Sequence, residues 1–155
     1  MRKGAAFGGL LAAFLLGATA VSLGGGLRAR LIAPERISVI EHAISDTVID
    51  IGGAGDTSGD LLTFANPVFD AANTTQVGRD QGDCIRIDPA TGKWECRWIT
   101  WIGGGAITVE GPFYDTRDST LAVTGGTGRF ANARGVMHLH ALSATEFKFT
   151  YELIP

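Results

Sequence analysis

Two polar side chains lie among apolar neighbours at positions where they could act on a small molecule. Glu41 lies in an alternating stretch that is typical of a β-strand, and its carboxylate is either solvated on the outer face or projected into an interior pocket. In a pocket, burial would raise the pKa of the Glu41 carboxyl. Asn66 precedes Pro67, which restricts the Asn66 backbone and favours a bulge or a sheet edge there. The sequence thus offers one acid for proton transfer and one amide for hydrogen bonding.

Two imidazoles form a weaker candidate site. His138 and His140 lie on one face of an expected strand, and Glu146 is a candidate third ligand for a metal ion. No fourth ligand is apparent, and this His spacing recurs on ordinary strands, so we predict no metal. The glycine-rich run 125–128 resembles a phosphate-binding loop, but a strand rather than a helix follows it.

The two cysteines flank an expected β-hairpin. Strands over 81–88 and 93–102 are separated by the turn sequence Pro-Ala-Thr-Gly, which places Cys84 directly opposite Cys96. The sulfurs are then within reach of one another, and we predict a disulfide. The alternative is a free thiol in a pocket.

The amino terminus has the layout of an export signal. Residues 1–20 combine Arg2-Lys3, an apolar run and Ala18-Thr19-Ala20, which predicts a signal peptide cleaved after Ala20. The alternative is a retained membrane anchor, because 19 residues from Ala5 to Leu23 carry no charge. Residues 21–35 are expected to form a linker, and residues 36–155 the exported domain. After processing we expect no stable membrane insertion.

Composition favours a folded domain that does not bind nucleic acid. The net charge is −3, the pI is about 5.5 and the basic residues are scattered, so the chain has no basic patch for phosphates. Apolar residues make up 45% of the chain, and its 22 glycines fall between strand patterns, as expected for many tight turns.

The chain is organised around the run 119–140, in which two alternating stretches flank the glycines at 125, 126 and 128. We expect the chain to turn at these glycines. No helical pattern of three turns occurs after the signal segment. About eight strands are expected: an extended first strand over 36–51, then 60–69, 81–88, 93–102, 106–114, 119–124, 133–142 and 146–153. This pattern predicts an all-β domain, either a closed antiparallel barrel or a sandwich.

Two long blocks resemble the barrel family that includes plant allene oxide cyclases and dirigent proteins. The blocks are GDLLTFANPVFDAANTTQVGRDQGDCIRI at 59–87 and GAITVEGPFYDTRDSTLAVTGGTGRFANARG at 105–135. The resemblance implies a closed barrel of about eight antiparallel strands, a largely apolar cavity, no cofactor and a homotrimer. The cyclases form a cyclopentenone from an allene oxide, and dirigent proteins steer the coupling of reactive phenolic intermediates.

The resemblance also assigns residues. Glu41, Asn66 and Cys84 match pocket positions of the cyclases, and Arg134 matches a pocket arginine of dirigent proteins. The Ser-Pro pair that follows the first strand in the cyclases has no counterpart, and a disulfide would occupy Cys84. An allene oxide is therefore a poor candidate for the substrate.

Three functions fit these observations. The first is an exported, cofactor-free barrel that cyclises or isomerises a hydrophobic, oxygenated small molecule, with Glu41, Asn66 and Arg134 as catalytic residues. Its expected ligand-binding residues are Tyr114, Trp98 and His138. The second is a binding barrel of lipocalin type for such a molecule, and the third is a structural envelope protein with a filled interior. Strand alternation leaves open which face of the Arg134 strand is inward. If Arg134 points inward, His138 and His140 do too.

Overall fold

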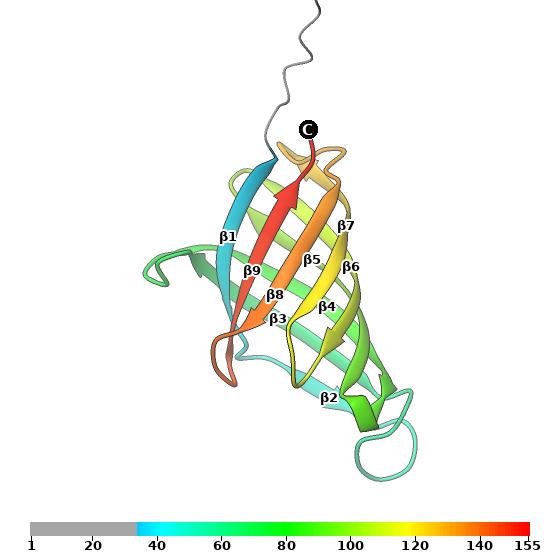
Figure 1. Cartoon of the computed structure of the whole chain (residues 1–155). Helices are drawn as coiled ribbons and strands as arrows, with labels where there is room; N and C mark the ends of the chain where they lie inside the picture. Colours follow the sequence, from blue (N-terminus) through cyan, green and yellow to red (C-terminus); the bar gives the residue numbers. More distant parts are fainter. Residues whose placement is uncertain (1–33) are drawn as a thin grey trace, which may run out of the picture. The chain divides into compact units, whose positions relative to one another are not determined.

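The computed structural model describes residues 34–155, which form one antiparallel barrel (Figure 1). The predicted signal peptide and almost all of the predicted linker lie outside these residues. The described residues form nine strands and one short 3₁₀ helix, η1 (Pro89–Thr91). The strands are β1 (Glu35–His42), β2 (Thr47–Ile49), β3 (Leu61–Asp70), β4 (Gln76–Asp88), β5 (Lys93–Ile102), β6 (Gly105–Tyr114), β7 (Ser119–Gly128), β8 (Gly135–Ala141) and β9 (Glu146–Leu153).

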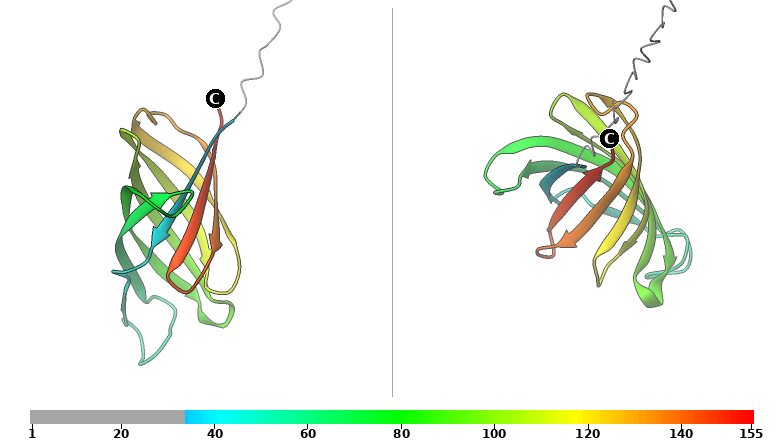
Figure 2. Two further views of the ribbon diagram at one scale, coloured as in Figure 1. Left: turned by 90° about the vertical axis from the view of Figure 1, so that its left-hand side faces the viewer. Right: turned by 45° about the horizontal axis from the view of Figure 1, so that its top comes forward.

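Eight of the strands close on themselves, which confirms the predicted barrel. The order around the wall is β1-β9-β8-β7-β6-β5-β4-β3, and β1 pairs with β3 to complete the ring. The short strand β2 pairs only with β3 and lies outside the ring. Figure 2 shows the ring from two further directions. Closure leaves few free strand edges and encloses an interior that side chains must fill.

The predicted first strand over 36–51 is in fact two strands, β1 and β2. Residues 43–46 separate them because the chain turns there around the side chain of Asn66. The backbone N–H groups of Ile44 and Ser45 each donate to Asn66 Oδ1 at 3.0 Å. These hydrogen bonds replace ladder pairing and redirect the chain toward β3.

Strict alternation along the strands determines which residues face inward. In β5, Trp94, Cys96, Trp98, Thr100 and Ile102 are buried, and the residues between them are exposed or half-buried. The same period in β8 buries Met137 and Leu139. The apolar inward residues of all eight wall strands form one core.

The glycines at 125–128 do not turn the chain, contrary to the sequence prediction. β7 continues through them to Gly128, and the turn follows at 129–134. A Cβ atom on Gly126 would lie 2.4 Å from the carbonyl oxygen of Phe130 and 2.6 Å from that of Ala106. Gly126 therefore allows the following turn to fold back closely over the strand.

Two further local predictions agree with the structure. Cys84 and Cys96 are paired across β4 and β5 and form a disulfide with an S–S distance of 2.01 Å. The pairing of β3 with β4 shifts between Val68 and Phe69, so a bulge lies just beyond Pro67 as expected.

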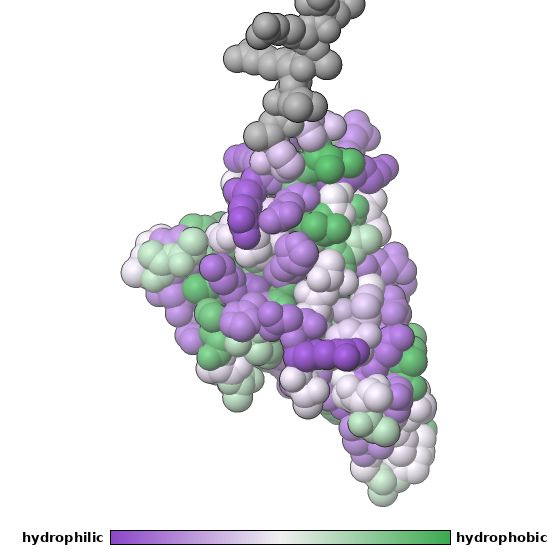
Figure 3. Space-filling view, in the orientation of Figure 1, coloured by the Kyte–Doolittle hydropathy of each residue, from purple (hydrophilic) through white to green (hydrophobic). Residues whose placement is uncertain are grey.

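Within residues 34–155, no helix has the length and apolar character needed to cross a bilayer. Hydrophilic residues cover most of the outer face that carries β1, β9 and β8 (Figure 3).

Candidate active site

A small pocket lies inside the barrel, toward the end at which β1 finishes and β9 begins. Its volume is about 40 Å³. One side is polar and carries Glu41 and Asp46, and the remainder is apolar. The apolar lining consists of Leu62, Phe64, Cys84, Cys96, Trp98, Phe113, Leu139, Phe147 and Phe149.

Glu41 is the buried acid of this pocket. It lies near the end of β1, faces the interior and is only 6% exposed. Burial raises the pKa of the Glu41 carboxyl to about 7, and the charge of Asp46 adds to this rise. A hydrogen bond from Asn66 opposes the shift. Glu41 therefore exchanges its proton close to neutral pH, as a general acid or base must.

Asn66 holds Glu41 in place. Its Nδ2 donates to Glu41 Oε1 at 2.8 Å and to Asp46 Oδ1 at 2.8 Å. Its Oδ1 accepts the two backbone hydrogen bonds of the turn after β1 and a third from the Ser45 hydroxyl. Because every polar atom of this buried amide is engaged, Asn66 orients the acid and has no free group for a substrate.

Asp80 is a second buried acid, which the sequence analysis did not identify. It lies on β4, directly opposite Asn66 on β3 and Thr100 on β5, and it is 1% exposed. Neither carboxyl oxygen has a hydrogen-bond partner among the described residues. Burial, together with the charge of Glu41, raises the pKa of Asp80 to about 9. Alternation along β4 offered a signal, because Asp80 lies four residues before the inward Cys84.

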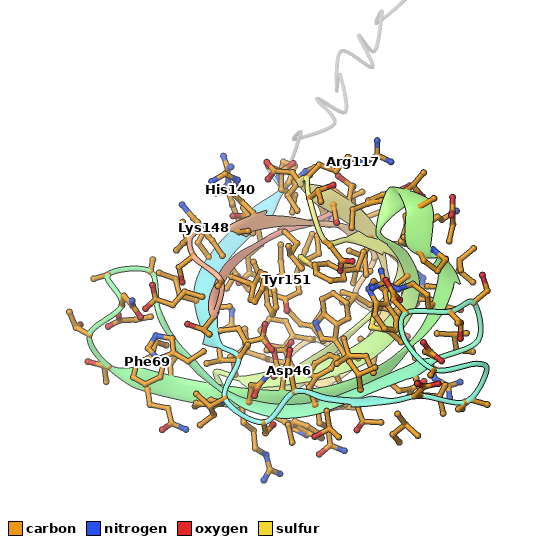
Figure 4. The ribbon with its side chains drawn as sticks, turned by 90° about the horizontal axis from the view of Figure 1, so that it is seen from below. Asp46, Phe69, Arg117, His140, Lys148 and Tyr151 are labelled. Atoms are coloured by element: carbon orange, nitrogen blue, oxygen red, sulfur yellow. A yellow bond between two sulfur atoms is a disulfide. The ribbon has the colours of Figure 1, made fainter. Side chains whose placement is uncertain are left out.

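Two hydroxyl groups extend the row of buried polar residues around the inner wall of the barrel. Thr100 Oγ1 and Tyr151 Oη are 2.8 Å apart, and both residues are buried. Burial raises the pKa of the Tyr151 phenol above its usual value, so the phenol stays neutral. Seen from below, Tyr151 lies within the ring of strands and Asp46 lies near its edge (Figure 4).

Aromatic rings and the disulfide form the rest of the pocket. The Trp98 ring lies 5.5 Å from Phe149 and 6.0 Å from Phe64, centroid to centroid. Phe113 and Phe147 meet edge to face at 6.2 Å, and both are half-buried. Trp98 Nε1 is itself buried, and it has no hydrogen-bond partner within residues 34–155.

The structure brings together only part of the predicted site. Glu41, Asn66 and Trp98 converge, as described above. Arg134 is exposed, its guanidinium donates to the backbone carbonyl of Ala133, and it does not belong to the lining of this pocket. Arg134 lies in the turn that precedes β8 and is not part of a wall strand.

Two predicted ligand-binding residues also lie elsewhere. His138 is exposed on the outer face of β8, where its Nδ1 is 3.1 Å from the Thr120 hydroxyl. The inward positions of β8 are taken by Met137 and Leu139. Tyr114 ends β6 outside the pocket lining, with the Arg117 guanidinium 3.8 Å from its ring centroid. Among the described residues, no cluster of His, Cys, Asp and Glu side chains could hold a metal ion.

The fold and the pocket define a class of protein: a closed antiparallel barrel with an acid inside a mainly apolar pocket. The chain belongs to the allene oxide cyclase family, whose model matches residues 42–154. This confirms the resemblance seen in the sequence.

Solved structures of several proteins share this fold. A pyocyanin demethylase is 24% identical with a TM-score of 0.67, over 77% of this chain and 99% of that one. A pterocarpan synthase dirigent protein is 14% identical with a TM-score of 0.63, over 77% and 87%. The Diels-Alderase AbmU from Streptomyces koyangensis is 14% identical with a TM-score of 0.58, over 79% and 70%. At these identities the likeness concerns the fold alone.

Proposed function

We propose that the protein catalyses the cyclisation or isomerisation of a hydrophobic, oxygen-bearing small molecule, using Glu41 to transfer a proton. The observation that carries the proposal is the carboxyl of Glu41: 6% exposed, with a pKa of about 7, at the wall of a pocket that is otherwise mainly apolar. An acid that titrates near neutral pH can both take and return a proton within one reaction. A pure carrier has no need of such a group.

The neighbouring groups support this role. Asn66 fixes the direction of the Glu41 carboxyl, and Trp98 contributes an aromatic ring to the pocket lining. The apolar wall folds a flexible substrate into one shape and limits the access of water. Family membership agrees with the proposal, and the similar folds include a dirigent protein and a Diels-Alderase.

Substrate entry requires the pocket to open. The volume of about 40 Å³ holds a few water molecules, whereas an engineered cavity that binds benzene measures about 150 Å³. Phe113 and Phe147 are the half-buried rings of the lining that meet each other edge to face. Rotation of these two side chains would enlarge the pocket without disturbing the strands.

We also propose that the protein acts outside the cytoplasm. The expected signal peptide at 1–20 supports this, and so does the disulfide between Cys84 and Cys96, since disulfides persist mainly in oxidising compartments. A homotrimer, expected from the family resemblance, belongs to the same proposal.

The test compares the small molecules of strains that carry the wild-type gene, a deletion, Glu41→Gln or Glu95→Gln. Glu95 is an exposed acid on the outer face of β5, so its replacement is the matched control. Cyclisation and isomerisation conserve mass. We therefore expect the deletion and Glu41→Gln strains to lose one compound and accumulate another of identical mass, while Glu95→Gln resembles wild type.

Two outcomes would count against this function. Exchange of compounds that differ in mass would indicate a different reaction. An unchanged profile in Glu41→Gln, with a changed profile in the deletion strain, would show that Glu41 does not carry the chemistry.

A further inference from the structure

The ionisable side chains that line the pocket all carry acidic groups. Glu41 and Asp46 are the charged members of the lining, and Asp80 lies beside Glu41 within the wall. Basic side chains occur at the same end of the barrel, but Arg117, His140 and Lys148 lie outside the ring of strands (Figure 4).

A further cation near this end is already neutralised. Arg86 is buried, but its guanidinium binds Asp56 at 2.7 Å and Asp115 at 2.6 Å, and it stacks on Trp94. It does not belong to the pocket lining. An anionic substrate would therefore meet negative charge and find no cation in the lining.

The aromatic rings of the pocket also favour a cation over an anion. The lining includes Trp98 and the rings of Phe64, Phe113, Phe147 and Phe149. The faces of such rings carry a partial negative charge and attract cations, most strongly where water is excluded. A flat cation is attracted both by these rings and by the nearby carboxylate of Glu41.

Asp80 provides a separate indication. It is 1% exposed, and both of its oxygens lack a donor within the described chain, so the ionised form is very poorly stabilised. Positive charge brought into the pocket would stabilise the ionised forms of Glu41 and Asp80 together. No protein side chain of the described lining supplies it.

We propose that the pocket selects a flat aromatic cation, with a quaternary or protonated ring nitrogen, over neutral and anionic molecules of the same shape. This inference rests on the proposed function in that it names the substrate class of the same pocket. Charge selection is nevertheless a property of binding, and it can be measured without turnover.

The proposal makes binding depend on pH in a defined direction. The groups that face Glu41 are Asp46 on the turn after β1, Asp80 on β4 and the neutral Tyr151 on β9. A cation favours the ionised form of Glu41, so binding releases a proton at pH values near and below its pKa of about 7. Affinity for a cation should therefore rise between pH 6 and pH 8, by about tenfold.

The experiment uses three flat probes: N-methylpyridinium, toluene as its neutral isostere of the same shape, and the slightly larger anion benzoate. Titration calorimetry in two buffers of different ionisation enthalpy gives both the affinity and the number of protons released. At pH 8 we expect N-methylpyridinium to bind at least about tenfold more tightly than toluene, and benzoate to bind most weakly.

Variants test whether the acids cause this preference. Glu41→Gln should remove the proton release and most of the preference for the cation, and Asp46→Asn should weaken the preference by a smaller factor. Asp83→Asn is the matched control, because Asp83 pairs with Arg97 on the outer face and its loss changes the net charge equally.

Equal binding of N-methylpyridinium and toluene, tighter binding of benzoate, or no binding of any probe would overturn the proposal. The two proposals can fail separately. A cation preference without an exchange of equal-mass compounds would refute the reaction but keep the charge selection. An exchange of equal-mass compounds without a cation preference would support the reaction but refute the charge selection.

Discussion

Asp60 and Asp80 are both 1% exposed, yet they lie in opposite environments. Asp60 precedes β3, at the end of the connection that follows β2, and accepts hydrogen bonds from the Ile51 and Thr57 backbone N–H groups at 3.0 and 2.8 Å. The Thr57 hydroxyl donates a further bond. Asp80 lies inside the barrel and has no donor among the described residues.

The pKa values shift in opposite directions as a result. The N–H groups of Thr57 and Ile51 lower the pKa of Asp60, while burial raises that of Asp80 to about 9. Burial therefore does not identify a functional acid by itself. A buried acid with several hydrogen-bond donors within reach is ionised and anchors a loop, whereas a buried acid with none keeps its proton.

The largest expected effect is a gain of stability in Asp80→Asn. Because the pKa of Asp80 is raised in the folded state, the unfolded chain loses its proton near pH 4 and the folded chain only near pH 9. Wild-type stability thus falls as the pH rises between these values. Asparagine has no proton to lose, so at pH 8 the variant should be more stable by on the order of 3 kcal/mol.

Urea unfolding at pH 4 and pH 8 measures this gain, which should shrink toward pH 4. Asp83→Asn, an outward acid on the same strand, should show no comparable change with pH. If Asp80→Asn were no more stable than wild type at pH 8, the contrast between the two aspartates would be lost.

Asp60→Asn should have the opposite sign and a smaller size. The pKa of Asp60 is lowered in the folded state, so its contribution to stability is present above about pH 4 and is lost as the pH falls through the folded pKa. The variant should be less stable than wild type at pH 7, and the difference should shrink as acid protonates Asp60 in the folded protein. Thermal unfolding at pH 7 and at lower pH values tests the prediction, and a penalty that grows toward low pH would contradict it.

The barrel and half of its site could be predicted from local sequence. Alternation located the wall strands, and the turn Pro-Ala-Thr-Gly fixed the register that joins Cys84 to Cys96. Glu41 and Asn66 were recognisable as polar residues within apolar strands. These features depend on neighbours in sequence or on one hairpin.

The errors arose where distant parts of the chain decide the outcome. Gly126 was expected in a turn, but its role depends on the close approach of the Phe130 and Ala106 carbonyls. The sequence left the orientation of Arg134 open, and the structure places it in a turn outside the wall. Asp80 becomes significant only because closure of the barrel brings it beside Glu41, which lies 39 positions away in the chain.

The smallest expected effect concerns Asp46, a solvent-exposed acid beside Glu41. Its charge adds to the rise in the pKa of Glu41, so Asp46→Asn should lower that pKa by less than about one unit. The asparagine side-chain oxygen can still accept the hydrogen bond that Asn66 Nδ2 donates to Asp46 Oδ1 at 2.8 Å. The carboxyl carbon signal of Glu41 in a ¹³C-labelled sample should then titrate at lower pH than in wild type. A shift toward higher pH would mean that Asp46 acts on Glu41 through geometry rather than through charge.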